Sequence, residues 1–273
     1  MTGTVPAQIQ TQASANLIKI RTGWRVSKVV FHIATGFFLL LASGAIIWHH
    51  TPAQRAATRW WHKRLLKILN IELNVIADAE LVFPALFVSN HISWLDIPVI
   101  GSILPTYFLS KEEVRKWPLI GTLAAGAGTL FIQRGNGKTH LAADTLALHM
   151  KNGRSVLFFP EGTTTDGASI KTYHHKLFAC VKDESIAMHA ISLRYFDADG
   201  SHSITAPFIG DDEFVGHLLR LLKQDKVWVE VKLSAPQYRE QKDDRRLAQS
   251  LLHITHQLRG RPNFCKDEPQ DLN

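Results

Sequence analysis

The sequence predicts an α/β domain, with a mixed and mainly parallel sheet flanked by helices, preceded by an N-terminal membrane-inserted helix or helical hairpin. Three observations support this fold class. From about residue 80, short apolar runs alternate with helical or turn segments. Residues 29–48 include no Lys, Arg, Asp or Glu over 20 positions, about the length that crosses a bilayer core. The chain of 273 residues is also long enough to bury a sizeable core.

The positive charge is unevenly distributed along the chain. The formal net charge is +7, yet no Asp or Glu precedes Glu72, and 9 Lys or Arg residues lie before it. The remainder carries 22 basic residues against all 24 acidic ones, a formal charge of −2. A nucleic-acid-binding protein should carry its excess positive charge on the folded body, so we expect no nucleic-acid partner.

The apolar run at residues 29–48 is the first predicted element. A secretory signal peptide is disfavoured because the run is longer than a typical signal core and ends in Trp48-His49-His50 rather than in small residues. A buried core helix is the other alternative, although few soluble helices of this length lack a charged face. Basic residues flank both ends, so either a span or a re-entrant hairpin with a bend at Gly36 or Ser43-Gly44 fits.

The second element is an amphipathic helix over residues 52–70. Thr51-Pro52 is a favourable helix start. A basic stripe and an apolar stripe, each repeating every four residues, lie on opposite faces. The basic stripe consists of Arg55, Arg59, Lys63 and Lys67, and the apolar stripe of Ala57, Trp61, Leu65 and Leu69. This pattern predicts a helix lying in an anionic membrane interface, with a surface helix packed on the protein core as the alternative.

The body of the chain alternates between predicted strands and helices. The strands are expected at Leu86 to Ser89, Tyr107 to Ser110, Thr129 to Gln133, Ser155 to Phe159, Ile186 to Tyr195, Ser203 to Ala206 and Val227 to Leu233. The helices are expected at Trp94 to Leu104, Lys138 to Met150, Tyr173 to Val181, Asp211 to Leu222 and Asp243 to His256. We therefore divide the chain into a membrane-anchoring segment (1–71), a catalytic domain (72–260) and a C-terminal tail (261–273).

Cysteine and histidine spacing bears on redox state and metals. Cys180 and Cys265 form no CxxC pair, so a reducing compartment is the default expectation. His174 and His175 are adjacent rather than spaced as metal ligands, so we expect no metal site.

Two loops that follow predicted strands carry candidate chemistry. The first contains His91 and Asp96, five positions apart, too far around a continuous helix to touch. His91 is therefore expected at the strand exit, Ser93 as the helix N-cap and Asp96 in the first helical turn, which lets the carboxylate fold back onto the imidazole. Such a pair suits general-base chemistry. The alternative is a core histidine beside an N-terminal helix charge.

No GxSxG motif is present, so no serine nucleophile is indicated. A His-Asp pair without its own nucleophile suits the activation of a hydroxyl that arrives on a substrate. A membrane-bound lipid hydrolase, in which the pair activates water, and a nonenzymatic membrane-tethered binding module are the alternatives from other classes.

Four sequence blocks in order resemble the glycerolipid acyltransferases typified by 1-acylglycerol-3-phosphate acyltransferase. They are NHISWLD (90–96), FLSKEEV (108–114), GTLFIQR (128–134) and FPEGT (159–163). The resemblance implies His91 as general base, Asp96 as its partner, and Lys111, Arg134, Glu161, Gly162 and Thr163 as substrate-binding residues.

One departure from the family pattern concerns the acceptor. Thr164 stands where the third block usually has an arginine, which removes a bidentate phosphate ligand. The EGTTTDG segment is more similar to the subgroup that includes lyso-ornithine lipid acyltransferases.

The resemblance implies acyl transfer to the free hydroxyl of a lysolipid without a covalent enzyme intermediate. The acyl donor is expected to be acyl-CoA or acyl carrier protein, used as a co-substrate, with no other cofactor. The first-choice acceptor is 1-acyl-sn-glycerol-3-phosphate, giving phosphatidic acid, and a lyso-ornithine lipid is the alternative. The N-terminal segment places the enzyme on the anionic face of the inner membrane, with its catalytic domain toward the cytoplasm.

Overall fold

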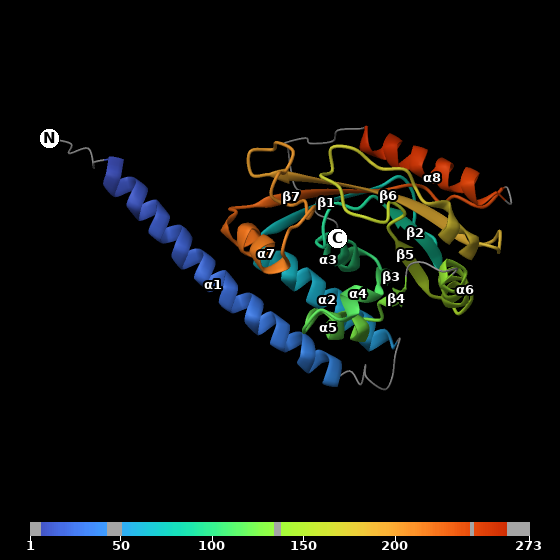
Figure 1. The fold of residues 1–273 in the computed structure, drawn as a ribbon, viewed down its shortest axis with the longest axis horizontal. Helices are drawn as coiled ribbons and strands as arrows, with labels where there is room; N and C mark the ends of the chain where they lie inside the picture. The colour runs from blue at the N-terminus through green and yellow to red at the C-terminus, as the bar shows by residue number, and fades with distance from the viewer. Residues whose placement is uncertain (1–6, 43–50, 134–137, 241–242, 261–273) are drawn as a thin grey trace.

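A computed structural model describes residues 7–42, 51–133, 138–240 and 243–260. One seven-stranded sheet, in the order β1-β7-β6-β2-β5-β3-β4, organises the domain (Figure 1). Every neighbouring pair is parallel except β6 and β7, which are antiparallel. The predicted α/β class with a mixed, mainly parallel sheet is therefore confirmed.

The strands are Ile71–Ala77 (β1), Ala85–Ser89 (β2), Thr106–Lys111 (β3), Leu130–Ile132 (β4), Ser155–Phe158 (β5), Ala187–Asp197 (β6) and Val227–Leu233 (β7). The helices are Ala7–Ala42 (α1), Pro52–Leu69 (α2), Asp96–Ile103 (α3), Glu112–Arg115 (α4), Ile120–Gly126 (α5), Lys138–Lys151 (α6), the 3₁₀ helix His175–Cys180 (η1), Phe214–Lys223 (α7) and Asp244–Arg259 (α8).

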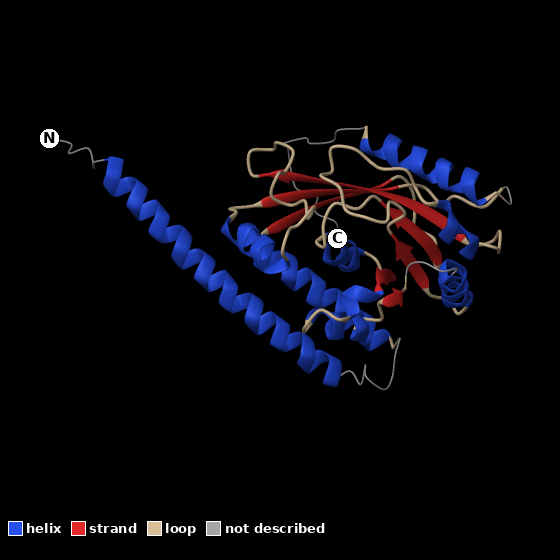
Figure 2. Ribbon diagram, viewed as in Figure 1, coloured by secondary structure: helices blue, strands red, loops and turns tan. Residues whose placement is uncertain are grey.

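The core has two parts, one on each face of the sheet. On one face, side chains from α2, α3 and α7 pack on alternate residues of the strands, such as Phe87 and Leu193. On the other face, α6, η1 and α8 cover residues such as Val88 and Ala190. Figure 2 shows the helices arranged on both sides of the strands. Helices cover both faces of the sheet, so both faces of its strands are buried. The strands are therefore short apolar runs in the sequence.

Strand prediction fails in two places. β1 was not predicted, although Ile71, Leu73 and Val75 alternate with more polar residues at the period of a strand. Conversely, the strand predicted at Ser203 to Ala206 is wrong. Ser203 instead bonds Asp197 through its hydroxyl and accepts the Ala206 N–H, and local bonds of this kind compete with strand pairing.

α1 lies along one side of the domain and extends beyond it at its N-terminal end (Figure 1). Its segment Asn16–Ala42 is long and apolar enough to cross a membrane, by length and composition. It overlaps the predicted run 29–48 at residues 29–42, and residues 43–48 lie outside the described residues. The helix continues unbroken through Gly36, so the bend proposed there is wrong, and the alternative bend at Ser43-Gly44 lies outside the described residues. Side chains on one face of α1, including Val29, are buried against the domain.

Two arginines of α1 form hydrogen bonds with the C-terminal end of α7. Arg25 donates to the carbonyl oxygens of Leu222 and Gln224 at 3.1 and 2.5 Å, and Arg21 donates to that of Lys223 at 2.7 Å. Carbonyls at a helix C-terminus lack intrahelical partners and carry partial negative charge, so cations are favoured there. These two basic residues therefore bind the protein itself.

α2 begins where the sequence predicts, with the Thr51 hydroxyl accepting the Gln54 N–H at 3.1 Å. Its apolar stripe packs on the protein core, because Leu65 and Leu69 are 8% and 1% exposed. The expectation that this stripe faces lipid is therefore wrong. Arg55, Lys63 and Lys67 on the opposite stripe remain exposed.

Candidate active site

The loops that follow β2 and β5 lie side by side, because these strands are parallel neighbours and their carboxyl ends meet at one edge of the sheet. Hydrogen bonds join the two loops. The His91 N–H donates to Oε1 of Glu161 at 2.7 Å, and the Thr165 N–H donates to the His91 carbonyl at 2.9 Å. The two loops that carry candidate chemistry therefore form one site.

The His91 and Asp96 side chains form a direct hydrogen bond, with 2.8 Å between His91 Nδ1 and Asp96 Oδ2. The same oxygen accepts the backbone N–H groups of Ile92 and Ser93 at 2.7 and 3.0 Å. These bonds turn the chain sharply at the start of α3, so the carboxylate folds back onto the imidazole as predicted. With the proton assigned to Nδ1, Nε2 is left as a hydrogen-bond acceptor.

The start of α3 differs from the prediction in one respect. Ser93 was expected to cap the helix, but its hydroxyl has no hydrogen-bond partner among the described residues, and the N-cap position belongs to Leu95. Asp96 itself, in the first helical turn, accepts the N–H groups of Ile92 and Ser93 in the loop before the helix. Asp96 therefore serves both as partner of His91 and as the organiser of its own loop.

Tyr195 of β6 completes the environment of the carboxylate. Its hydroxyl donates to Oδ1 of Asp96 at 2.8 Å, and its side chain is buried. Burial, followed by the neighbouring Asp96 charge, raises the pKa of Tyr195 well above its ordinary value. Sequence reasoning missed this residue. The only available signal was a tyrosine in a strand expected to be buried, where its hydroxyl needs a partner.

The His91 ring is held in place from one side by Phe159. The two rings are stacked, with centroids 3.9 Å apart and planes inclined by 13°. The His91 side chain is 19% exposed, while that of Asp96 is fully buried. The imidazole therefore presents one edge to an open space and the other to the buried carboxylate.

Glu161 lies behind the site rather than in it. Its two carboxylate oxygens accept the backbone N–H groups of His91 and Lys171, each at 2.7 Å, and the residue is 3% exposed. Burial raises the pKa of Glu161, and the two N–H donors oppose this shift. The structure thus places Glu161 as a link between the His91 loop and residue 171, and a contact with substrate stays a prediction.

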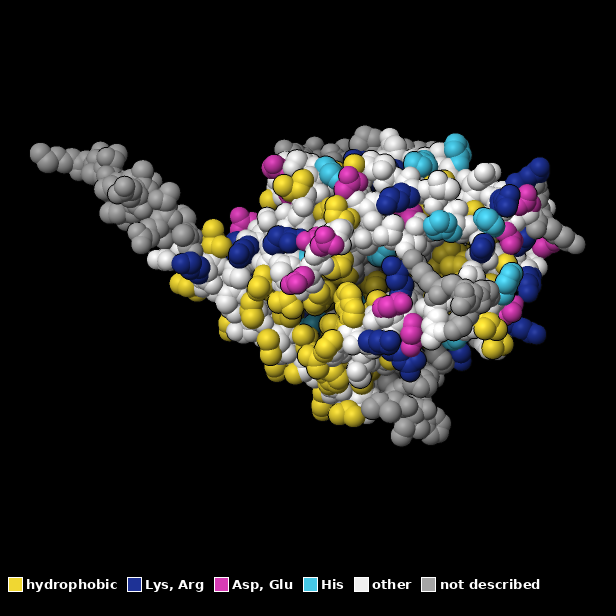
Figure 3. Space-filling view, in the orientation of Figure 1, with side chains coloured by type: hydrophobic (Ala, Val, Ile, Leu, Met, Phe, Trp, Pro, Cys, Tyr) yellow, Lys and Arg dark blue, Asp and Glu magenta, His cyan; other side chains and the backbone are white. Residues whose placement is uncertain are grey.

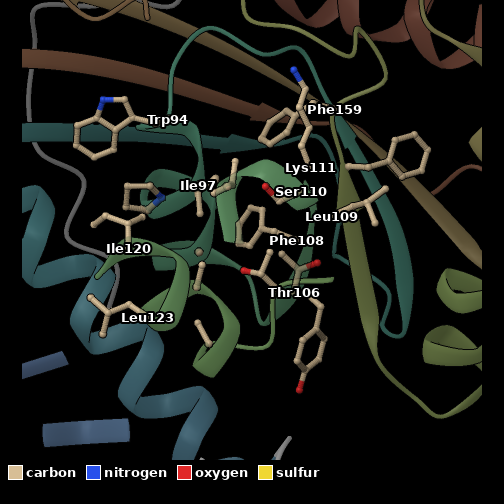
Figure 4. A pocket seen from close by; sticks show the side chains of 18 of the residues that line it. Trp94, Ile97, Thr106, Phe108, Leu109, Ser110, Lys111, Ile120, Leu123 and Phe159 are labelled. Atoms are coloured by element: carbon tan, nitrogen blue, oxygen red, sulfur yellow. The ribbon is translucent and has the colours of Figure 1, made fainter. Parts of the chain in front are cut away.

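A cavity of about 1060 Å³ opens beside His91. Its walls are mainly apolar and come from α1, α2, α3, β3, α5 and α7. Figure 4 shows apolar side chains gathered between α2 and the sheet, with Lys111 and Phe159 drawn at one end and Leu123 at the other. In Figure 3, apolar side chains gather where α1, α5 and α7 meet, around a hollow in this face. The volume is sufficient for a long apolar ligand.

Three of the other predicted site residues line the cavity. Lys111, at the carboxyl end of β3, lines the cavity together with Gly162 and Thr163. Gly162 adopts a φ of 70°, a left-handed conformation that glycine accommodates without strain. Thr164, in place of the arginine usual in the family pattern, also lines the cavity. Arg134 lies outside the described residues.

Within residues 7–42, 51–133, 138–240 and 243–260, no group of three or more His, Cys, Asp or Glu side chains is arranged to hold a metal ion. His174 and His175 lie next to each other in the cavity wall.

Comparison with known proteins defines the class. A family model described as Acyltransferase matches residues 75–194, which include both loops of the site. The fold is that of the 1-acyl-sn-glycerophosphate acyltransferase from Thermotoga maritima, with a TM-score of 0.64 over 89% of this chain and 96% of that one, at 15% identity.

Two relatives of known name indicate the family and its reaction. The chain is 45% identical over 186 residues to a lyso-ornithine lipid O-acyltransferase of Pseudomonas aeruginosa, covering 68% of this chain and 71% of that protein. It is 31% identical over 172 residues to a 1-acyl-sn-glycerol-3-phosphate acyltransferase of Neisseria gonorrhoeae, covering 62% and 67%. The chain belongs to the acyltransferase family and is an acyltransferase of lysolipids. The resemblance drawn from the four sequence blocks is thereby confirmed.

Proposed function

We propose that this enzyme transfers an acyl group from a thioester to the hydroxyl of a lyso-ornithine lipid, with His91 as general base. The observation that carries the mechanism is the pairing of His91 Nδ1 with Asp96, which leaves Nε2 as the acceptor at the edge of the cavity. A base must lie within hydrogen-bond reach of the proton that it removes, and this geometry allows it.

In the proposed reaction, the lysolipid hydroxyl gives its proton to His91 Nε2 as its oxygen attacks the thioester carbonyl carbon. The tetrahedral intermediate collapses, the carbon–sulfur bond breaks, and the departing thiolate takes the proton from Nε2. Asp96 balances the positive charge that the imidazole carries between these steps. Because a thioester is reactive, no covalent enzyme intermediate is needed.

Lys111, Arg134, Gly162 and Thr163 are proposed to position the acceptor headgroup. Support for three of them comes from their place in the cavity wall, near His91 or at the neighbouring strand end. Support for Arg134 comes from the sequence block alone. Glu161 is proposed to act by holding the His91 loop, since both of its oxygens bind backbone N–H groups.

The choice of acceptor rests on two observations. Thr164 offers no bidentate ligand for a phosphate, and an ornithine headgroup carries no phosphate ester. The Pseudomonas aeruginosa relative, at 45% identity, is named for the lyso-ornithine lipid reaction. The second candidate, 1-acyl-sn-glycerol-3-phosphate, is favoured by the Neisseria gonorrhoeae relative at 31% identity.

We propose that the enzyme works on the cytoplasmic side of the inner membrane and takes its acyl group from acyl-CoA or acyl carrier protein. The apolar segment Asn16–Ala42 and the exposed cations of α2 support contact with an anionic membrane surface. The division at residue 71 stays a proposal. α1 and α2 serve as walls of the cavity as well as parts of the proposed anchor.

In the test, purified enzyme is incubated with both lysolipids together. Labelled acyl-CoA and labelled acyl carrier protein serve as alternative donors. We expect the lyso-ornithine lipid to be consumed first, and His91→Ala to lower kcat by about 10²- to 10⁴-fold. Preferred consumption of the glycerol phosphate acceptor would reverse the choice of acceptor. Release of free fatty acid with no transfer would favour a hydrolase, and near-full transfer by His91→Ala would refute the mechanism.

A further inference from the structure

An aromatic part of the cavity wall has no role in the proposed reaction. Trp94, Trp117 and Phe214 line the cavity, and we refer to these three side chains as the aromatic wall. The ring centroid of Phe214 lies 4.9 Å from that of Trp94 and 5.9 Å from that of Trp117. All three residues are partly exposed, so a molecule in the cavity is able to contact them. Trp94, labelled in Figure 4 among the lining side chains, is three residues after His91.

A hydrogen bond to His217 of α7 fixes the orientation of the Trp94 indole. The Trp94 Nε1–H donates to Nδ1 of His217 at 3.0 Å, and Nε2 of His217 lies 3.0 Å from the carbonyl oxygen of Pro207. Since a carbonyl only accepts, Nε2 carries the proton, and Nδ1 is left to accept the indole N–H. Burial lowers the pKa of His217, while the bond to Pro207 opposes this shift, so the ring is neutral at neutral pH. Only this neutral form accepts a hydrogen bond from Trp94.

A second hydrogen bond joins the same part of the chain to the catalytic loop. The Phe208 N–H donates to the carbonyl oxygen of Ile92 at 3.0 Å. The segment that leads into α7 is thus bonded to the loop one residue after His91, and α7 itself is bonded to the loop three residues after His91. The aromatic wall is therefore held at two points beside the proposed general base.

The outer face of α7 is apolar and exposed. Val215, the residue after Phe214, is 65% exposed, and Leu219, about one turn further, is 39% exposed. α7 packs on α1, whose segment Asn16–Ala42 is apolar and long enough to cross a membrane. In Figure 3, apolar side chains gather where α1, α5 and α7 meet, around a hollow in this face. The aromatic wall therefore lies between His91 and an apolar surface of the protein.

This position favours one of the two substrates. A lysolipid is held in a membrane by its acyl chain, so it must reach His91 from an apolar surface. The thioester donor arrives attached to a charged, water-soluble carrier. Aromatic side chains bury a large apolar area, about 150–250 Å² each, and so provide favourable contact for the methylene groups of a chain. The aromatic wall therefore suits the chain of the acceptor.

We propose that the aromatic wall binds the acyl chain of the acceptor lysolipid beside His91, and that His217 is a positioning residue that holds Trp94 in this wall. The inference rests on the proposed function, which places the reacting hydroxyl at His91, and it adds the place of the acceptor's chain. Lys111 and Thr163 are proposed above for the headgroup, so the headgroup and the chain occupy different parts of the cavity.

Binding to the native full-length protein in detergent provides the first test and requires no turnover. The ligands are a lyso-ornithine lipid, 1-acyl-sn-glycerol-3-phosphate and a thioether analogue of acyl-CoA, which cannot transfer its chain. We expect Trp94→Leu to weaken the binding of the preferred lysolipid by roughly 3- to 10-fold and to leave the binding of the thioether unchanged. Trp228 of β7 is also partly exposed but does not line the cavity, so Trp228→Leu should change neither affinity.

Variants of His217 test its positioning role. His217→Leu removes the acceptor and should weaken lysolipid binding by a similar factor. His217→Gln supplies an oxygen for the indole N–H and an N–H for Pro207, so it should recover part of the affinity. Trp94→Phe tests the same bond from its other side, since it keeps an aromatic ring but removes the N–H, and it serves if His217→Leu does not fold.

His189→Leu is the matched control for His217→Leu. His189 is equally buried, its Nδ1 lies 2.9 Å from the Ser234 carbonyl oxygen, and it does not line the cavity. Its replacement should lower the free energy of unfolding without changing the affinity for the lysolipid. A loss of affinity as large as that of His217→Leu would overturn the positioning role of His217.

Steady-state kinetics of Trp94→Leu should show a raised KM for the lysolipid, with kcat changed by less than about twofold. Unchanged affinity for the lysolipid in this variant, or an equal loss of affinity for the thioether analogue, would overturn the inference. Failure of the native enzyme to acylate any lysolipid would refute the proposed function instead, since the binding measurements involve no turnover.

Discussion

At the scale of single residues, the buried carboxylate of Asp96 is the most extensively hydrogen-bonded group described in the site. Four described donors converge on its two oxygens: the His91 ring, the backbone N–H groups of Ile92 and Ser93, and the Tyr195 hydroxyl. Three of these donors lie within five residues of Asp96, and the fourth comes from β6. Tyr195 is thus the long-range contribution that fixes Oδ1.

Tyr195→Phe should lower kcat by about tenfold and leave the KM for the lysolipid unchanged. The change removes the donor to Asp96 but keeps the ring, so a buried oxygen loses its partner. Tyr195 does not line the cavity, so acceptor binding should not respond. Steady-state kinetics with varied lysolipid separates the two constants. A raised KM with unchanged kcat would contradict this assignment.

Tyr173→Phe provides the matched control. Tyr173 is also buried, and its hydroxyl donates to Thr255 of α8 at 3.0 Å on the other face of the sheet. Its loss should lower the free energy of unfolding by about 1 kcal/mol without reducing kcat. A reduced kcat in this control would show that general destabilisation explains the effect at Tyr195.

At the scale of elements, the contact between α2 and α3 depends on the absence of a side chain at Gly101. A Cβ there would lie 2.0 Å from His62 Nδ1 and 2.4 Å from Cε1. The His62 ring cannot easily withdraw, because it is buried beside Trp61. Small-residue contacts of this kind allow the two helices to form one wall of the cavity.

Gly101→Ala should therefore lower the free energy of unfolding by about 1–3 kcal/mol, the usual cost of overpacking. Gly23→Ala in α1 is the control, since an added Cβ there meets nothing within 4 Å. It should be neutral or stabilise by up to about 1 kcal/mol, because alanine favours helix. Chemical denaturation of both variants measures the difference. Equal stability of Gly101→Ala and the native protein would contradict the close packing.

Burial of His62 makes stability depend on pH. The pKa of His62 is about 4 in the folded protein and 6.5 in the unfolded chain, so the unfolded chain binds more protons between these values. Stability is fully present above pH 6.5 and is lost as pH falls toward 4. His62→Asn should reduce the loss between pH 7 and pH 5 by about 2 kcal/mol, measured by denaturant unfolding at both pH values. An unchanged loss would refute the assignment.

At the scale of the whole molecule, the sequence predicts what depends on local pattern. The alternation of apolar runs gave the sheet class, and the spacing of His91 and Asp96 required the turn that the structure contains. Contacts created by strand pairing were not predictable. Tyr195 meets Asp96 across 99 residues because β6 lies next to β2. Likewise, nothing in the stripes of α2 distinguished a lipid-facing surface from a core-facing one.

α1 has an exposed apolar face and a face buried in the cavity wall, so mutation can separate its proposed role as an anchor from its place in that wall. Phe38 and Leu41 are 67% and 68% exposed, while Val29 is buried and lines the cavity. Phe38→Ser with Leu41→Ser should weaken sedimentation with anionic vesicles, because less apolar area enters the lipid, yet preserve acyl transfer to lysolipid in detergent.

Val29→Ser should produce the opposite result. It places a hydroxyl in the core cluster and the cavity wall, so transfer in detergent and thermal stability should fall while vesicle binding is retained. The pair of variants distinguishes a helix that serves only as an anchor from one that also builds the active site. If Val29→Ser transferred acyl groups normally in detergent, α1 would be an anchor alone, and the wall that it forms in the structure would be dispensable for catalysis.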